Sequence, residues 1–250
     1  GPLSMGLFGR LFGNRAPDLP PADLSRVGVD MHSHFIPGID DGSPDLDTTM
    51  ELLQAMVDLG YRTVITTPHS MADGYRNPND KILAGLEQVR AEASRRGIAI
   101  EVEASAEYYL DHELEEKVKR KDIITFGDKL LLFELSFMGE PNALRSVVFE
   151  MQTAGYRPVL AHPERYTFWG GQLEKFEDLK DRGVLFQVNI PSLSGRYGPG
   201  VQKTAEQLID RGWVELIGTD CHGMMHIEAV QGTLTAPYLH KLIDSGKLLN

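Results

Sequence analysis

Short runs of apolar and β-branched residues recur along this chain, each separated from the next by a stretch with helical periodicity. The seven runs lie at residues 27–31, 63–67, 98–104, 130–133, 158–161, 184–188 and 214–219. They are continuous rather than alternating, which is typical of parallel strands covered on both faces. Seven strand–helix units can be counted, and no eighth. The pattern therefore predicts one α/β domain folded as a closed or distorted (β/α)7 TIM-like barrel.

The stretches between the runs predict the helices. Ser43-Pro44 is interpreted as an N-cap followed by proline at the first helical position. The helix after it carries an apolar face and ends at Gly60, because glycine suits the left-handed turn that often closes a helix. Further helices are predicted at about residues 80–96, 142–154, 173–182, 200–211 and 225–245. We expect no second domain and no low-complexity insert.

The composition narrows the classes of function. A chain of 250 residues, 42% of them hydrophobic, can bury a substantial core. Its formal net charge of −11 argues against nucleic-acid binding, which needs basic surface. No apolar run reaches the roughly 18–20 residues that span a bilayer. The single cysteine excludes an internal disulfide framework. We expect a cytoplasmic protein, and the sequence leaves its oligomeric state open.

The N-terminal segment is expected to precede the barrel as a tail and a linker. Residues 1–4 are interpreted as a remnant of protease cleavage of an expression tag, with Met5 as the natural start. Residues 5–26 are predicted to form a tail and a proline-rich linker, and residues 27–250 the domain. The tail combines leucine and phenylalanine with arginine. Contact with a membrane surface or a partner is therefore an alternative to a disordered or packed tail.

Nine potential metal ligands are spaced along the chain, and nearly all of them follow a predicted strand. They are His32, His34, Asp41, His69, Glu107, Glu134, His162, Asp220 and His222. A parallel barrel presents the C-terminal ends of its strands on one face, where functional side chains gather. We therefore expect these side chains to converge, although they are far apart in sequence.

Two pairs among these residues have the spacing of a chelate. His32 and His34 lie two residues apart on or just after a strand, so their imidazoles should point the same way. The same period turns Asp220 and His222 together and Cys221 to the opposite face. Each pair alone is a weak signal, because buried histidines and helix-capping aspartates are common. The joint pattern at five separate strand ends favours a metal site.

The chain also closely resembles the bacterial CpsB/YwqE-type tyrosine-protein phosphatases of the polymerase and histidinol phosphatase (PHP) superfamily. The resemblance rests on Glu134 and on the segments Asp30-Met-His32-Ser-His34-Phe-Ile-Pro-Gly-Ile-Asp-Asp41-Gly, Thr67-Pro-His69, His162-Pro-Glu-Arg165 and Thr219-Asp220-Cys-His222. It extends from about Val27 to at least His222. The segments that end in Pro-Gly-Ile-Asp-Asp-Gly and His-Pro-Glu-Arg are specific to this branch of the superfamily.

The resemblance implies a single PHP domain with a trinuclear metal centre that hydrolyses phosphate monoesters. It divides the ligands among three ions, with Glu107 bridging the first two: His32, His34 and Asp220; Glu134 and His162; Asp41, His69 and His222. The mixture of imidazole and carboxylate without thiolate suits manganese, iron or zinc better than calcium or a soft metal. We expect three divalent ions, with manganese as the first choice.

The activity that the resemblance implies is that of a protein-tyrosine phosphatase acting through a metal-bound hydroxide. Two ions roughly 3.5–4 Å apart can lower the pKa of a shared water toward about 7. Arg165 lies three residues past His162 and is the expected catalytic arginine, because guanidinium forks match phosphate geometry. A surface salt bridge is its alternative role. The implied partner is a phosphotyrosine protein of surface-polysaccharide export, with the C-terminal tail of a bacterial tyrosine kinase as one candidate.

Aromatic residues also follow the predicted strands. They are Phe35, Tyr108, Phe137, Tyr166, Phe168 and Trp169. We expect either an aromatic-lined entrance for a phenyl ring or packing residues at the rim of the barrel.

The chain departs from the family at a second phosphate-binding arginine. Better-known members carry it a few residues after the final histidine, in an Arg-Pro-Pro context, whereas residues 223–228 here read Gly-Met-Met-His-Ile-Glu. His226 or Arg196 could take its place. Two alternative functions stay open: a small-molecule PHP enzyme, such as a histidinol-phosphate phosphatase or a phosphodiesterase, and a non-catalytic phospho-binding protein.

Overall fold

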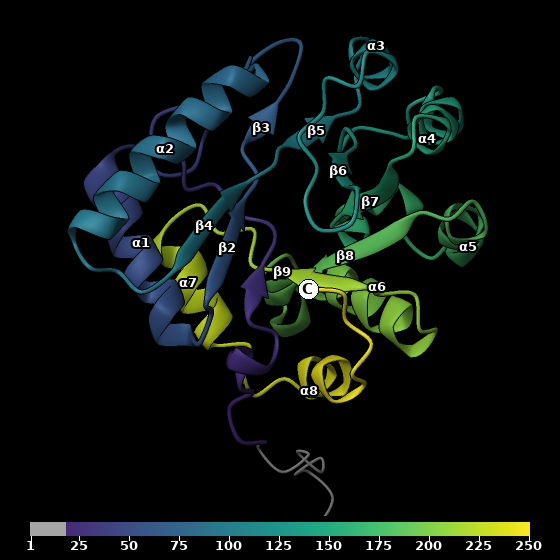
Figure 1. Cartoon of the computed structure of the whole chain (residues 1–250). Helices are drawn as coiled ribbons and strands as arrows, with labels where there is room; N and C mark the ends of the chain where they lie inside the picture. The colour runs from purple at the N-terminus through teal and green to yellow at the C-terminus, as the bar shows by residue number, and fades with distance from the viewer. Residues whose placement is uncertain (1–18) are drawn as a thin grey trace, which may run out of the picture.

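The computed structural model describes residues 19–250, in which helices alternate with strands that form two parallel sheets (Figure 1). The strands are β1 Val29–Asp30, β2 Thr63–Thr66, β3 His69–Ser70, β4 Glu101–Ala104, β5 Glu107–Tyr109, β6 Leu130–Glu134, β7 Arg157–Ala161, β8 Leu185–Asn189 and β9 Leu216–Gly218. The helices are α1 Leu46–Leu59, α2 Asn79–Arg95, α3 Leu114–Lys119, α4 Leu144–Thr153, α5 Leu173–Asp181, α6 Pro199–Asp210, α7 Met224–Gln231 and α8 Pro237–Asp244. Short 3-10 turns lie at Leu24–Arg26, Pro163–Arg165, Thr167–Trp169 and Ile190–Ser194.

The strand segments occupy seven positions, because two positions are interrupted. Thr67 and Pro68 separate β2 from β3, and a similar break separates β4 from β5. β2 pairs with β4, and β3 pairs with β5, both in parallel. The order then continues through β6, β7, β8 and β9, again in parallel. The predicted seven strand–helix units are confirmed.

The first and last strands meet through a small number of bonds. Just past β1, Ser33 forms a parallel bridge with Cys221, and the His34 N–H donates to the Cys221 carbonyl at 2.9 Å. Toward the other end of the barrel, the side-chain amide of Asn250 fills the space between the strands. Its Nδ2 donates to the carbonyl oxygens of Val29 and Ile217, at 3.0 and 2.7 Å. The strands therefore form a distorted barrel of two parallel sheets, which meet at this seam through few bonds.

Apolar side chains form two clusters, one on each face of the strands. In β6, Leu130 and Leu132 belong to the smaller cluster, whereas Leu131 and Phe133 belong to the larger one. The smaller cluster fills the inside of the barrel with Met31, Ile65, Phe126, Leu130, Leu132, Val159, Ala161 and Leu216. The larger cluster packs the helices against the outside. Burial on both faces explains why the strands read as continuous apolar runs.

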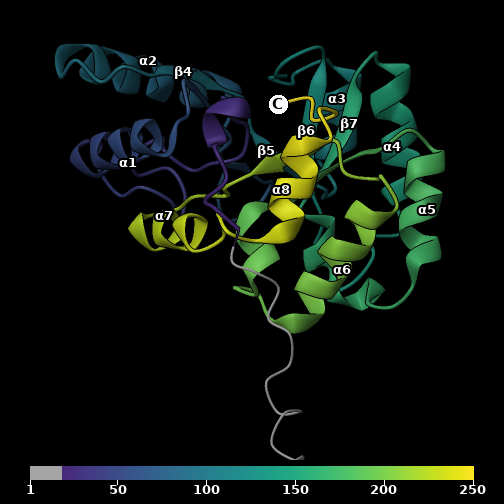
Figure 2. The same cartoon turned by 90° about the horizontal axis from the view of Figure 1, so that it is seen from below.

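The helices surround the sheet. α1 and α2 lie beside β1, β2 and β4, whereas α3 to α6 cover the side formed by β5 to β9 (Figures 1 and 2). α1 ends at Gly60 as predicted, and that glycine has a φ of 108°.

Two details of the predicted helices were wrong. The N-cap of α1 is Asp45, whose side chain accepts from the Thr48 N–H at 2.7 Å. Ser43 cannot serve there, because its hydroxyl is turned to the Asp45 carbonyl. The predicted helix at residues 225–245 is two helices, and the second begins at Pro237, which has no N–H to continue the first.

The chain packs against the barrel before residue 27. Leu24 is buried in the larger cluster, and the Ala22 N–H donates to the Leu234 carbonyl at 2.7 Å. The predicted contact of the tail with a membrane or a partner falls on residues 1–18, outside the described residues. From residue 19 onward, every helix is too short or too polar to cross a bilayer.

Candidate metal centre

The nine predicted ligands come together at the C-terminal ends of the strands. Their ligand atoms form four overlapping groups, and within each group the atoms lie within 4.8 Å of one another. The groups are His34, Asp41, His69 and His222; His32, His162 and Asp220; His32, His34 and Glu107; and His69, Glu107 and Glu134. The structure thus places every predicted ligand beside others, and their binding of metal stays a prediction.

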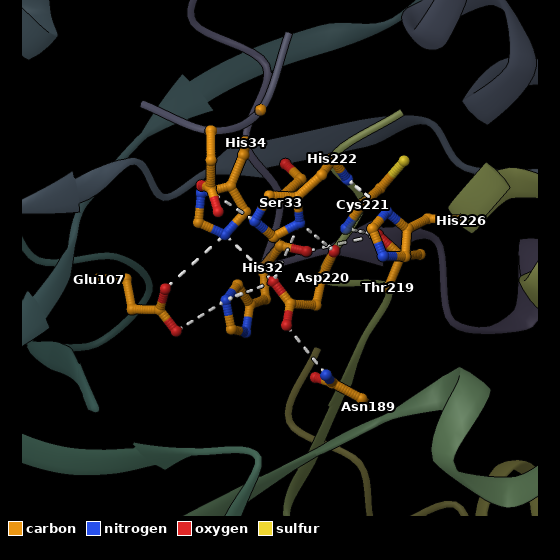
Figure 3. Close-up of polar contacts among 12 residues, drawn as sticks. His32, Ser33, His34, Glu107, Asn189, Thr219, Asp220, Cys221, His222 and His226 are labelled. Carbon is orange, nitrogen blue, oxygen red and sulfur yellow. Dashed lines mark hydrogen bonds and ion pairs between the residues drawn. The ribbon is translucent and has the colours of Figure 1, made fainter. Parts of the chain in front are cut away.

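The candidate ligand atoms at the centre of the cluster are arranged to bind a cation rather than to hydrogen-bond one another. His32 Nε2 and Glu107 Oε2 lie 3.0 Å apart and are buried, yet neither atom has a hydrogen-bond partner. Asp220 Oδ1 lies 3.1 Å from the Nε2 atoms of both His32 and His34 (Figure 3). Buried polar atoms without partners are rare and costly. A divalent cation among these atoms would satisfy them, so the donor set fits the predicted metal.

Hydrogen bonds at the far ring nitrogens fix the histidines. His32 Nδ1 lies 2.7 Å from Gln187 Oε1, and His34 Nδ1 lies 2.9 Å from Asp40 Oδ2. An acceptor at Nδ1 holds the proton there and leaves the Nε2 lone pair free for a metal. Gln187 and Asp40 were not among the predicted site residues. Gln187 had a signal, since it is a polar residue inside the apolar run of β8.

Further polar residues hold the last strand. Asn189 Nδ2 donates to Asp220 Oδ2 at 3.0 Å, and Gln187 Nε2 donates to Asn189 Oδ1 at 3.0 Å. The Asp30 carboxylate accepts from the N–H and the hydroxyl of Thr219, at 2.9 and 2.8 Å. Burial raises the pKa of Asp30 to about 6. The Asp30–Thr219 bonds join the first and last strands, and the Asn189 bond ties Asp220 to β8.

Two of the candidate ligands adopt a left-handed backbone, with φ of 35° at His162 and 51° at Asp220. Positive φ is uncommon for residues other than glycine, and such strain gathers at functional sites. Ala161 already faces the inside of the barrel, so regular alternation would turn His162 outward. The left-handed turn instead brings His162 Nε2 to 3.3 Å from Glu107 Oε2. The strained backbone thus directs the His162 side chain toward the other candidate ligands.

Two glycines let the backbone approach the ligands. A Cβ on Gly218 would lie 2.8 Å from the Cβ of His32. A Cβ on Gly42 would lie 2.2 Å from the His34 carbonyl oxygen. Any larger residue at either position would displace a histidine.

The closely spaced carboxylates of the cluster favour positive charge among them. Burial, and then the neighbouring Glu107 carboxylate, raise the pKa of Glu134 to about 7. Burial lowers the pKa of His69, but Glu107, Asp41 and Glu134 outweigh it and raise that pKa to about 12. Hydrogen bonds from His222 and His69 lower the pKa of the Asp41 carboxyl. Because close carboxylates repel, cations placed among them are stabilised.

A cavity of about 760 Å³ lies against the ligand cluster. Arg165 lines it, and its Nη1 lies 3.6 Å from Asp220 Oδ2. The guanidinium carbon is 4.0 Å from the centre of the Tyr197 ring and 5.0 Å from that of Phe137. Tyr197 was missed by the sequence analysis, because it lies between glycines in a loop without periodicity.

The predicted aromatic entrance is formed largely by other residues. In the described part of the chain, one of the six predicted aromatics, Phe137, lines the cavity. The other aromatic residues in its wall are Tyr75, Tyr109 and Tyr197. Tyr108 and Tyr166 are packing residues: the first donates its hydroxyl hydrogen to Asn79 Oδ1, and the second accepts from the Leu135 N–H. Phe35, Phe168 and Trp169 also pack in or against the larger apolar cluster.

His226 lies in the cavity wall, whereas Arg196 is exposed and is absent from that wall in the described part of the chain. The His226 Nδ1 accepts from the His222 N–H at 3.0 Å. Burial, and then His222, lower the pKa of His226 to about 4. Its imidazole is therefore neutral, with the proton on Nε2.

Comparisons with known proteins agree with this geometry. The chain matches the sequence profile of the CpsB/CapC family of capsular polysaccharide synthesis over residues 28–236. It is 26% identical to tyrosine-protein phosphatase YwqE of Bacillus subtilis over 197 residues, and this alignment covers 78% of each chain. It is 27% identical over 202 residues to tyrosine-protein phosphatase CpsB of Streptococcus pneumoniae, covering 78% of this chain and 83% of CpsB.

Solved structures show the same fold. One match is a crystal structure from the pair YwqE of Bacillus subtilis and CpsB of Streptococcus pneumoniae, described as metal-dependent tyrosine phosphatases. It has a TM-score of 0.76 and 26% identity, and it covers 82% of this chain and 85% of that one. The lactonase Lmo2620 from Listeria monocytogenes shares the fold alone, with a TM-score of 0.54 and 10% identity over 92% of both chains. Since the profile match takes in every strand and all nine candidate ligands, the chain belongs to the CpsB/CapC family.

Proposed function

We propose that this protein is a metal-dependent phosphomonoester hydrolase that acts on phosphotyrosine in proteins. The observation that carries the proposal is the grouping of nine imidazole and carboxylate side chains, seven of which line one cavity together with Arg165. The relatives YwqE and CpsB are both tyrosine-protein phosphatases, which supports the same activity here.

The ligands would hold three divalent ions, with manganese preferred to iron or zinc. Glu107 belongs to two of the four ligand groups, which suits a bridging carboxylate. His34 lies with Asp41, His69 and His222 as well as with His32, so its single free ring nitrogen lies where the two groups meet. When bound, such ions lower the pKa of coordinated water toward about 7 and neutralise phosphoryl charge.

The protein's own groups orient the substrate. Arg165 presents its N–H edge to the cavity and would bind the phosphoryl oxygens in a forked hydrogen bond. His226, neutral and protonated on Nε2, would donate a second hydrogen bond in place of the family's second arginine. The tyrosyl oxygen, with a pKa of about 10, leaves without a strong general acid.

The biological substrate would be a phosphotyrosine protein of capsular polysaccharide synthesis. The CpsB/CapC family description supports that setting. The C-terminal tail of a bacterial tyrosine kinase is the candidate that we would test first.

The test compares p-nitrophenyl phosphate, a phosphotyrosine peptide and histidinol phosphate on the metal-loaded protein. We expect hydrolysis of the two aryl esters and loss of that activity on chelation, with recovery after manganese is added back. A preference for histidinol phosphate would replace the proposal with a small-molecule phosphatase. Bound metal without hydrolysis of any of the three esters would leave a phospho-binding protein.

Arg165→Ala tests the role of the arginine. Removing one charged group that stabilises a transition state costs on the order of a hundredfold in rate, and we expect that loss here without loss of metal. Arg157→Ala is the matched control, because Arg157 begins β7, the strand that leads to Arg165, at the far end of the barrel. Loss of metal from the Arg165 variant would contradict the assigned role.

A further inference from the structure

We infer that Tyr197 is a positioning residue that holds Arg165 in the orientation needed to bind the phosphoryl group. The inference rests on the proposed function and deepens it, since it names what orients the arginine. It starts from the two rings that enclose the guanidinium, Tyr197 at 4.0 Å and Phe137 at 5.0 Å.

The two rings leave the guanidinium little freedom. A guanidinium is planar and stacks on aromatic faces, so contact with two rings limits its movement and leaves its N–H edge to face a ligand. That edge faces the ligands, because Nη1 lies 3.6 Å from Asp220 Oδ2. Without the rings, the arginine could move onto the Asp220 carboxylate and form a closer ion pair. The stack keeps it beside the metal ligands rather than bound to one of them.

The two rings are held differently. Tyr197 lies between the turn at Ile190–Ser194 and α6, flanked by Gly195 and Gly198, which have positive φ of 82° and 98°. The Gly198 N–H donates to the Gly195 carbonyl at 3.0 Å, so a tight turn carries the Tyr197 ring. Phe137 is 47% exposed and stacks on His162, with ring centroids 5.7 Å apart. Tyr197 is therefore the nearer and less exposed support.

The experiment measures phosphate binding and hydrolysis in the metal-loaded protein. Tyr197→Leu removes the aromatic face, whereas Tyr197→Phe removes the hydroxyl and keeps the face. We expect Tyr197→Leu to raise the KM for p-nitrophenyl phosphate and the calorimetric Kd for inorganic phosphate by about tenfold, as loss of a cation–π contact would. Metal content should not change, and Tyr197→Phe should stay within about twofold of the parent.

A double variant shows whether Tyr197 acts through Arg165. In an Arg165→Ala background, Tyr197→Leu should change phosphate affinity no further, because the group that it positions is gone. An equal loss in both backgrounds, or no loss in the parent, would overturn the inference. Tyr197→Met serves the same comparison if the leucine variant does not fold. The calorimetric Kd does not depend on turnover, so it still decides the inference if the parent hydrolyses none of the esters.

Discussion

The two sides of the candidate metal centre differ in what holds their side chains. On the buried side, His32 and Glu107 are 0% and 1% exposed, and His34 is also 0% exposed. On the open side, Asp41 is 51% exposed and His222 is 21% exposed. Figure 3 shows His32, His34 and His222 gathered about Asp220, with Glu107 facing His32.

The buried side is held by hydrogen bonds behind its histidines. Its histidines have hydrogen-bond partners at the far ring nitrogens, Gln187 for His32 and Asp40 for His34. Asp41 follows Asp40 in the irregular segment between β1 and α1, but it is exposed and meets His69 and His222 at 3.3 Å each. The difference teaches that burial and a hydrogen bond at the far ring nitrogen hold one part of the centre, while an exposed loop carboxylate completes the other. We therefore expect ions on the open side to exchange more readily.

The largest effect should follow loss of a buried ligand. His32→Ala removes a donor from two ligand groups, so at least one ion should be lost. Metal stabilisation of a transition state is worth several kcal/mol, so hydrolysis of p-nitrophenyl phosphate should fall by roughly a thousandfold. Circular dichroism should show the fold intact. Elemental analysis that finds full metal content in the variant would refute the assignment.

A smaller effect should follow loss of the group behind that ligand. Gln187→Leu keeps the size of the side chain but removes the acceptor at His32 Nδ1. Partners of this kind typically contribute about 10–100-fold to metal affinity, and a loss in that range is expected in a competition titration with a chelator. Gln54→Leu is the matched control, because Gln54 lies on the exposed face of α1. Equal affinities for the two variants would remove the distinction between the sides.

Change on the open side should cost less. Asp41→Asn keeps one oxygen donor, and His34, His69 and His222 remain around it. We expect metal to leave faster on dilution into chelator and hydrolysis to fall by no more than about tenfold, since one exposed charge is screened by solvent. If Asp41→Asn were as damaging as His32→Ala, the comparison would fail.

The smallest effect on the site should come from the far end of the barrel. Asn250→Ala removes the amide that bridges Val29 and Ile217. Each lost hydrogen bond is worth about 1 kcal/mol, or about 2–4 °C in Tm, so loss of both should lower the Tm by about 4–8 °C. Metal affinity should not change, because the bridge lies away from the ligands. Thermal unfolding and chelator competition on the same variant check both statements.

The sequence predicts those parts of the centre that have a local signature. A histidine or acid directly after an apolar run can be recognised without knowing the fold, which is why His69, Glu134 and His162 were found. The same reasoning recovers the seven strand positions. It misplaces the cap of α1, because Ser43 and Asp45 are both good caps and only the packing of the Ser43 hydroxyl decides between them.

Residues that act through tertiary contacts carry no such signature. Asp40 and Asp41 are adjacent and chemically identical, yet one bonds the back of His34 while the other faces the cavity. Which does which depends on the path of the chain past Gly42. Tyr197 reaches Arg165 from a separate loop, so no spacing in the sequence connects them.

The seam between β1 and β9 also determines when the centre can form. His34 and Asp220 are 186 residues apart in the chain, and the first strand has no partner on that side until the last one is made. At a synthesis rate of about 5–20 residues per second, the interval is on the order of ten seconds or more. During this interval, His32 and His34 lie next to a strand edge that has no partner. Chaperones shield surfaces of this kind. We expect the ions to enter only after the ribosome has released nearly the whole domain.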